Sequence, residues 1–254
     1  MQAPKKIAVA GATGRVGSHV VDVLEEGGHD VVGISRATGV DIVTGEGLPE
    51  ALEGVESVID AATGPSPEQE EATRFFTAAT RNLQAAGERA GVGRMVVVSI
   101  IGADRFTAGY GAAKLAHERA MLAGPVPALI LRASQFHEFV EQLLQWGTQG
   151  DIVHVPEMRT QIVAARTVAE VIADVATVPA SAGTELVEIA GPREERLIEL
   201  ASLFVSRRGL PLKVESVPTP ADPDAELQAN GGLLPGPEAK LAGPSFEEWL
   251  DQQQ

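Results

Sequence analysis

The chain has no cysteine, a single tyrosine and only 4% aromatic residues among its 254 positions. Without cysteine, disulfides and thiolate metal sites are excluded. Long apolar runs are missing too, and no stretch approaches the roughly 20 residues of a membrane-spanning helix. The apolar run at 7–10 follows Lys5 and Lys6 but is too short for a signal peptide, so a cytoplasmic location is expected.

Positive charge is scarce, with 20 Lys and Arg against 35 Asp and Glu and a net charge of -15. Nucleic acids and anionic membranes are bound by clustered Lys and Arg, so neither is expected as a partner. We expect a small-molecule substrate and a monomer or homodimer. His19, His29 and His117 share no spacing with carboxylates that would indicate a metal site, and no metal is expected.

Short runs rich in Val and Ile alternate with segments of helical period. This alternation predicts an α/β fold, a Rossmann doubly wound parallel sheet with helices on both faces. Strands are expected at 7–10, 31–34, 40–43, 57–61, 95–99 and 128–131, with helices that end at Gly27 and Gly91.

The pattern loosens after residue 150, where strands are expected at 152–155, 185–189 and 213–217 and helices near Thr167 and Arg193. We therefore expect a dinucleotide-binding core over 1–150 and a smaller substrate-binding or lid region over 151–254, interleaved with the core. Capping boxes at Thr167–Glu170 and Ser245–Glu248 predict two helix starts. Residues 218–244, rich in Pro and Gly, predict an extended loop that is either disordered or a substrate lid.

The stretch GATGRVG connects the first strand to the first helix. Glycines at 11, 14 and 17 allow a sharp turn, close approach of a pyrophosphate and tight packing of helix on sheet. The amides at the helix N-terminus suit two phosphates. The cofactor-binding residues expected here are Gly11, Thr13, Gly14, Arg15, Val16 and Gly17.

The end of the second strand indicates which dinucleotide is bound. NAD-preferring sites place an acid there, whereas this chain has Ser35 and Arg36, and Asp30 lies at the wrong end of the strand. A guanidinium pairs with a 2'-phosphate, so NADP(H) is expected in preference to NAD(H); the alternative is that Arg36 is a solvated loop residue. Asp41 and Ile42 are expected beside the adenine. Small residues at the end of the fourth expected strand leave room for the nicotinamide ribose, namely Ala61, Ala62 and Thr63.

Lys114 follows the lone Tyr110 by four residues, which places both on one face of a helix. The ammonium can lower the phenol pKa and hold a ribose hydroxyl, and a tuned phenol serves as a proton donor or acceptor. Ser99 ends the fifth expected strand, where its hydroxyl could hold a substrate carbonyl. The alternative is a surface tyrosine beside an unrelated lysine and serine.

GATGRVG, Ser99, the pair Tyr110 and Lys114, and the later LILRASQFHEFV resemble the atypical and extended short-chain dehydrogenase/reductases, in particular the NmrA-like NAD(P)-binding group. The resemblance covers residues 6 to about 217. It implies a Rossmann domain with a small C-terminal substrate region, NADP(H) binding, and hydride transfer with Tyr110 as acid, Lys114 as its support and Ser99 as carbonyl anchor. Ala133 departs from the family, which commonly has proline there.

Gln135, Phe136 and His137 follow the sixth expected strand and are expected to line the substrate pocket; the alternative is a polar helix start. The leading hypothesis is an NADPH-dependent reductase of a carbonyl, quinone or activated alkene. Some members of the resembled group have lost the tyrosine and act as redox sensors, so a sensor without turnover is an alternative. An isomerase or dehydratase that retains its cofactor is a third.

Overall fold

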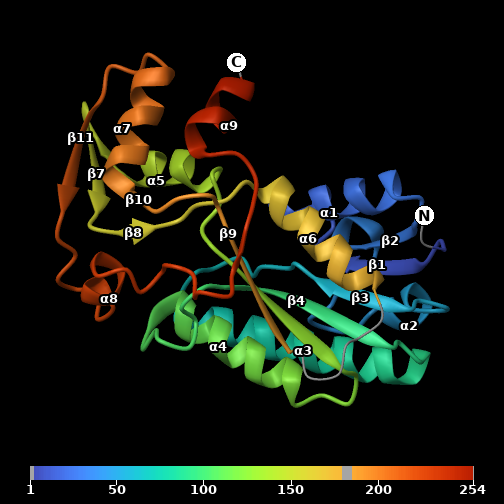
Figure 1. The fold of residues 1–254 in the computed structure, drawn as a ribbon. Helices are drawn as coiled ribbons and strands as arrows, with labels where there is room; N and C mark the ends of the chain where they lie inside the picture. The colour runs from blue at the N-terminus through green and yellow to red at the C-terminus, as the bar shows by residue number, and fades with distance from the viewer. Residues whose placement is uncertain (1–2, 179–184, 254) are drawn as a thin grey trace.

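The computed structural model describes residues 3–178 and 185–253 and contains a seven-stranded parallel sheet (Figure 1). Across the sheet the strands are β12 (Lys240–Leu241), β9 (Leu186–Ala190), β5 (Ala128–Ala133), β4 (Arg94–Ile100), β3 (Ser57–Asp60), β1 (Lys6–Ala10) and β2 (Asp30–Ile34). After β2 the chain crosses to the other side of β1 to form β3. Ligands of open α/β sheets bind at such a reversal, beyond the carboxyl ends of the strands.

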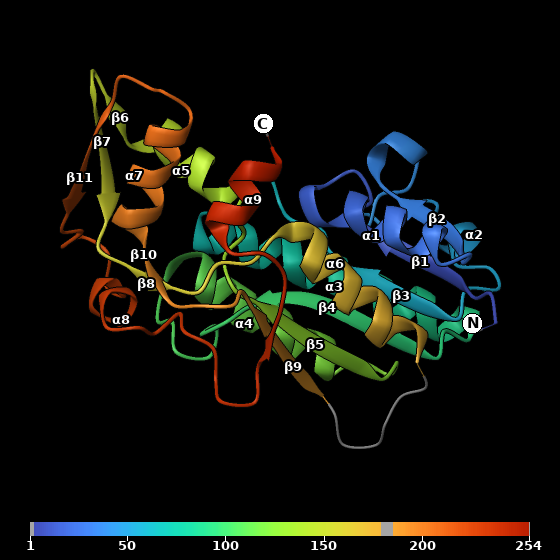
Figure 2. The same ribbon diagram turned by 45° about the horizontal axis from the view of Figure 1, so that its top comes forward.

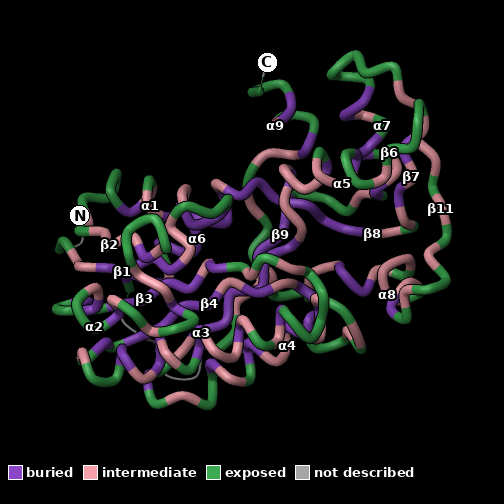
Figure 3. The backbone as a smooth tube through the Cα atoms, turned by 180° about the vertical axis from the view of Figure 1, so that it is seen from behind, coloured by how far each residue is buried: buried purple, intermediate pink, exposed green. Residues whose placement is uncertain are grey.

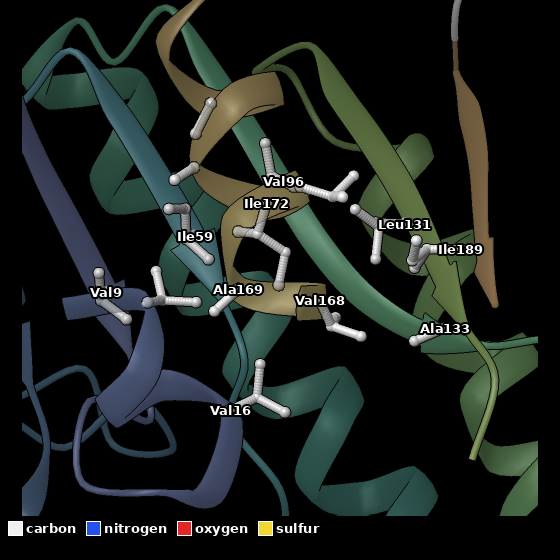
Figure 4. Close-up of a cluster of buried hydrophobic side chains, with 14 of the residues drawn as sticks. Val9, Val16, Ile59, Val96, Leu131, Ala133, Val168, Ala169, Ile172 and Ile189 are labelled. Atoms are coloured by element: carbon white, nitrogen blue, oxygen red, sulfur yellow. The ribbon is translucent and has the colours of Figure 1, made fainter. Parts of the chain in front are cut away.

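Helices cover both faces of this sheet, which confirms the expected Rossmann architecture. One face carries α3 (Gln69–Ala90) and α4 (Gly109–Leu122), and the other carries α1 (Arg15–Glu26) and α6 (Ala165–Thr177). Val168, Ala169 and Ile172 of α6 pack against strand side chains such as Val9, Ile59, Val96 and Leu131 (Figure 4). Buried residues follow the central strands (Figure 3), because parallel strands covered on both faces are apolar throughout.

A second group of elements lies beside the carboxyl edge of the sheet and has its own apolar core (Figure 2). Its members are α5 (Phe139–Gly147), β6 (Thr148–Gln149), β7 (Ile152–Pro156), β8 (Arg159–Thr160), β10 (Glu195–Arg196), α7 (Leu197–Arg207), β11 (Lys213–Val217), α8 (Ala225–Ala229) and α9 (Phe246–Gln252). The chain enters this group before residue 150 and leaves it for α6, β9 and β12. The two parts are therefore interleaved along the chain.

The strand expected at 40–43 is wrong. Asp41 makes one isolated bridge to Glu46, and its Oδ1 accepts hydrogen bonds from the amides of Val43 (2.7 Å) and Thr44 (3.2 Å). A carboxylate that binds amides two and three residues ahead favours a turn over a strand. The segment joins the short helices η1 (Arg36–Thr38) and α2 (Leu48–Ala51).

The two expected capping boxes have different outcomes. Ser245 and Glu248 form the predicted reciprocal cap of α9. Thr167 does not cap α6, which begins at Ala165 after Ala164, so Thr167 lies buried within the first turn. The apolar face that includes Ala165 and Val168 docks on the sheet, and this packing extends the helix beyond the polar signal.

Residues 218–244 are not an unstructured loop, since they contain α8 and β12. The carboxylate of Asp224 accepts hydrogen bonds from the amides of Thr107 and Ala108 and from the Thr107 hydroxyl, at 2.8–3.1 Å. The segment is thereby attached to the turn that leads into α4. Within the described residues, no helix is both long and apolar enough to cross a membrane.

Candidate active site

The glycine turn between β1 and α1 is formed by three glycines with different tasks. Gly11 has a φ of +78°, and a Cβ there would lie 2.8 Å from the backbone of Ala62. A Cβ on Gly17 would overlap the carbonyl oxygen of Gly11. Gly14 is exposed at the N-terminus of α1, with only the Gly11 oxygen (3.1 Å) within 4 Å of a Cβ position. The turn therefore fits a pyrophosphate, because Gly14 leaves it room beside unpaired helix amides.

Thr13 and Arg15 are exposed on this turn, whereas Val16 is buried in the core beneath it. Beside the turn, the Ala61 amide donates a hydrogen bond to the carbonyl oxygen of Ala10 (3.0 Å). The Ala62 amide donates one to the carboxylate of Asp60 (3.0 Å). Ala62 is buried and Thr63 is exposed. These small residues continue β3 into the same edge as the glycine turn.

At the end of β2, Ser35 caps η1 by exchanging hydrogen bonds with Thr38, and Arg36 is exposed. No acid occupies this strand end. Asp41 and Ile42 were expected beside the adenine on the basis of a strand that does not form. The Asp41 carboxylate instead accepts hydrogen bonds from the amides of Val43 and Thr44 within the turn, and Ile42 is buried in the core.

A cavity of about 390 Å³ opens beyond the ends of β4 and β5, and Tyr110 lies in its wall on the first turn of α4. Among the residues that the structure describes, no Lys, Arg or His lines the cavity. Its lining residues are Ile100, Ile101, Phe106, Ala108, Gly109, Tyr110, Gly111, Ala133, Ser134, Gln135, Phe139, Met158, Asp222, Pro223, Asp224, Gln228 and Leu233. The last five belong to the 218–244 segment, which therefore forms one wall.

Lys114 lies one turn after Tyr110, as expected, but its ammonium is buried under α4. Its Nζ donates to the carbonyl oxygen of Val98 (2.7 Å) and lies 3.0 Å from Nδ1 of His117 and 4.3 Å from the Phe76 ring centroid. The Nε2 of His117 lies 3.1 Å from the carboxylate of Asp60. Among the described residues no hydrogen bond joins Tyr110 to Lys114.

The expected lowering of the phenol pKa is not found. Burial and the negative charge of Asp60 raise the pKa of Tyr110 to about 12. Burial lowers the pKa of Lys114 to about 8, although Asp60 and Glu118 act in the opposite direction. At neutral pH the site therefore holds a protonated phenol and an ammonium, which suits proton donation.

Ser99 does not line the cavity. Its buried hydroxyl donates to Glu118 (2.5 Å), which also accepts two hydrogen bonds from Arg132 (2.9 and 2.8 Å). The cavity wall is formed instead by Ile100 and Ile101. A role as carbonyl anchor does not fit this position, because strand alternation turns the Ser99 side chain toward α4.

Of the three residues expected after β5, only Gln135 reaches the cavity. Phe136 packs against the core of the sheet. His137 is buried against α9, where its ring meets Phe246 and Trp249 edge-on, and its Nε2 lies 3.2 Å from the Ile162 carbonyl. Its role as a second proton donor to substrate does not fit this position.

Comparison with known proteins identifies the family. A sequence profile described as NAD(P)H-binding matches residues 11–179, about two thirds of the chain. The chain belongs to this NAD(P)H-binding family. The match begins at the first glycine of the turn, and with the fold it confirms the resemblance to atypical and extended short-chain dehydrogenase/reductases. The protein thus belongs to an NAD(P)H-binding family and has the fold that such domains share.

Several solved structures share the fold of this NAD(P)H-binding protein at low identity. MoeE5 in complex with UDP-glucose and NAD superposes with a TM-score of 0.77 and 21% identity, over 98% of this chain and 97% of that one. A dTDP-4-dehydrorhamnose reductase from Bacillus anthracis str. Ames in complex with NADP gives 0.73 and 17%, over 98% of each chain. TunA, an NAD-dependent NDP-hexosamine 5,6-dehydratase, gives 0.74 and 16%, over 98% and 96%.

One curated relative matches over a short segment. A 4-hydroxy-tetrahydrodipicolinate reductase of Natronomonas pharaonis is 41% identical over 58 residues, which is 21% of this chain and 24% of that protein. The chain thus matches about a quarter of the relative's length.

Four residues at the candidate site were not predicted from the sequence: Asp60, His117, Ser134 and Asp224. Two carry a visible signal, since His117 is one helical turn beyond Lys114 and Asp60 is a charge in the apolar run VIDAA. Ser134 lines the cavity, and its buried hydroxyl has no hydrogen-bond partner among the described residues. Asp224 gives no local signal, because its partners Thr107 and Ala108 are more than 100 residues away.

Proposed function

We propose that this protein is a cytoplasmic NADPH-dependent reductase of a carbonyl, quinone or activated alkene in a small molecule. The observation that carries the proposal is the placement of Tyr110, one helical turn before Lys114, in the wall of an apolar cavity at the carboxyl edge of the sheet. Bound NADPH would supply a hydride to the acceptor. The dinucleotide would be held by Gly11, Gly14 and Gly17 at its phosphates, with Thr13, Arg15 and the 61–63 segment beside it. The buried ammonium of Lys114 points to the Val98 carbonyl and His117, so in our proposal Lys114 supports the helix of Tyr110 from within and does not bind the ribose directly.

The chain's own part in the reaction is to orient the acceptor and supply a proton. The phenol of Tyr110, with a pKa of about 12, keeps its proton through the neutral range and is set to donate it to the acceptor oxygen or carbon. Ser134 replaces Ser99 in our proposal, since it lines the cavity and its buried hydroxyl has no hydrogen-bond partner among the described residues. Ile100 and Ile101 give the cavity an apolar wall, which would favour the exclusion of water around a bound acceptor.

The first test is Tyr110→Phe, assayed against a panel of quinones, enones and ketones. We expect turnover to fall about 100-fold or more, since general acid catalysis contributes that much, while NADPH affinity stays within about twofold. Tight NADPH binding without turnover on any acceptor, and no effect of Tyr110→Phe, would instead support the redox-sensor alternative, which the position of Ser99 outside the cavity favours. Turnover without added NADPH would identify a cofactor-retaining isomerase or dehydratase.

The preference for NADPH is tested separately at Arg36. The guanidinium is exposed just after β2, where no acid is present to accept a hydrogen bond from the ribose 2'-hydroxyl of NAD. We expect Arg36→Ala to weaken NADPH binding about tenfold or more and to leave NADH binding within about twofold, because only NADPH carries the 2'-phosphate. Nicotinamide fluorescence titrations with both nucleotides measure this. Equal losses for the two would assign Arg36 another role.

A further inference from the structure

Beneath Tyr110 lies a continuous row of buried polar groups that the proposed reaction does not by itself require. It runs from Asp60 at the end of β3 to His117 (3.1 Å), on to the ammonium of Lys114 (3.0 Å) and to the Val98 carbonyl (2.7 Å). His117 is fully buried and Asp60 and Lys114 are 2% and 3% exposed. An unpaired charge at such depth strongly destabilises the folded state, so the charged groups here need their hydrogen-bond partners to be stable.

The surroundings of His117 select one arrangement of protons. The ring stacks on Phe76 of α3, with centroids 4.5 Å apart and planes 9° from parallel. Its two nitrogens lie within hydrogen-bond distance of Lys114 and Asp60. The charged and titratable groups near it are Asp60 from β3 and Lys114 and Glu118 from α4, and Glu118 is paired with Arg132 of β5. Tyr110 packs edge-on against the same Phe76 ring, with centroids 5.8 Å apart.

Since an ammonium only donates, Nδ1 of His117 accepts from Lys114 and carries no proton. Nε2 then holds the proton and donates it to Asp60. Burial raises the pKa of Asp60, but the hydrogen bond from His117 and the charge of Lys114 outweigh this and leave it below its usual value. Burial, together with the charge of Lys114, lowers the pKa of His117, so the imidazole is neutral.

We propose that Asp60 and His117 are positioning residues that hold the Lys114 side chain in place and keep it charged. Neither residue lines the cavity. His117 contacts Lys114 directly, and Asp60 reaches Lys114 through the His117 ring. The neutral imidazole, fixed by its hydrogen bond to Asp60, accepts a hydrogen bond from the Lys114 ammonium and so holds it in position. The Asp60 carboxylate, on the far side of the ring, supplies the negative charge that balances the ammonium. The importance of this arrangement for reduction rests on the proposed function, but the arrangement itself is a property of the chain alone.

The decisive experiment is 15N NMR of the lysine side chains in the protein without cofactor. The chain has five lysines, so each signal can be assigned. Lys114 should lose its proton near pH 8 in the wild type. In Asp60→Asn, its midpoint should move down by about one unit or more, because a buried opposite charge favours the ammonium. Asp151→Asn removes the same charge at an exposed turn and should leave the midpoint unchanged. An unchanged midpoint in Asp60→Asn would overturn the proposal.

A second measurement needs no variant and therefore stands if Asp60→Asn does not fold. In 15N spectra of the wild type between pH 6.5 and 7.5, where Lys114 is an ammonium, His117 should be neutral with its proton on Nε2, and the other four histidines serve as references. A protonated ring in this range, or a proton on Nδ1, would contradict the proposed row. Both measurements are made without substrate and so do not depend on the proposed function. If they give the expected results but no acceptor is reduced in the turnover assay, the reductase proposal fails and this inference stands.

Discussion

Two buried serines place their hydroxyls in different surroundings. Ser99 and Ser134 are both buried at the ends of neighbouring strands, β4 and β5. The hydroxyl of Ser99 donates to Glu118, whereas that of Ser134, a residue of the cavity wall, has no partner among the described residues. An unpaired buried hydroxyl is destabilising unless a ligand completes it.

The two serines therefore predict opposite outcomes on truncation. Ser134→Ala should leave the free energy of unfolding unchanged or raise it by up to about 1 kcal/mol, and lower kcat/KM about three- to tenfold, the value of one neutral hydrogen bond. Ser99→Ala should lower stability by about 1–2 kcal/mol, with a smaller effect on kcat/KM. Urea unfolding and steady-state kinetics measure both; the reverse pattern would return the anchoring role to Ser99.

At the scale of elements, the helix that carries Tyr110 depends on a segment far away in the chain. Asp224, just before α8, binds the turn that leads into α4. The same segment supplies Asp222, Pro223 and Leu233 to the cavity wall. The cavity wall and the helix start are therefore fixed together by one carboxylate.

Replacement of this carboxylate tests the coupling. In Asp224→Asn one acceptor oxygen is replaced by a donor, so the amides of Thr107 and Ala108 lose acceptors in a buried place. We expect stability to fall by about 2 kcal/mol and KM to rise, with faster hydrogen exchange at Thr107 and Ala108. Asp151→Asn is the surface control. Unchanged exchange rates at those two amides would show that the segment is held by other contacts.

At the scale of the whole molecule, two cores are joined by a chain that passes between them several times. The smaller core includes α5, α7 and α9, so the last helix packs on residues from the middle of the chain. His137 sits at this contact, against Phe246 and Trp249, and burial lowers its pKa to about 4. Protonation of His137 therefore opposes docking of the C-terminal helix.

The consequence is a defined loss of stability in acid. Because the pKa of His137 is about 4 in the folded state against 6.5 when unperturbed, the unfolded chain takes up its proton first as pH falls. The contribution is complete above pH 6.5, and up to about 3 kcal/mol is lost between pH 6.5 and 4. His137→Gln should flatten the stability profile over this window, measured by denaturant unfolding. His154→Gln, on half-buried β7, is the control, and an unchanged slope in His137→Gln would refute the assignment.

The sequence by itself determined the features that depend on neighbouring residues. The alternation of apolar runs and helical segments is local, as are the glycine turn and the four-residue spacing of Tyr110 and Lys114. Steric and periodic constraints act within a few residues, so these patterns can be interpreted without a structure. They predicted the sheet, the family and the helix face of the site.

Only the tertiary structure decided which side chains meet. The contact of His117 with Asp60 spans 57 positions and that of Asp224 with Thr107 spans 117, and no local pattern encodes either. Packing also overrode local signals at Thr167, and a turn replaced the strand expected at 40–43. The cavity beside Tyr110 is assembled from four separate stretches of chain, and the free energy of burial and pairing, rather than spacing, selects its residues.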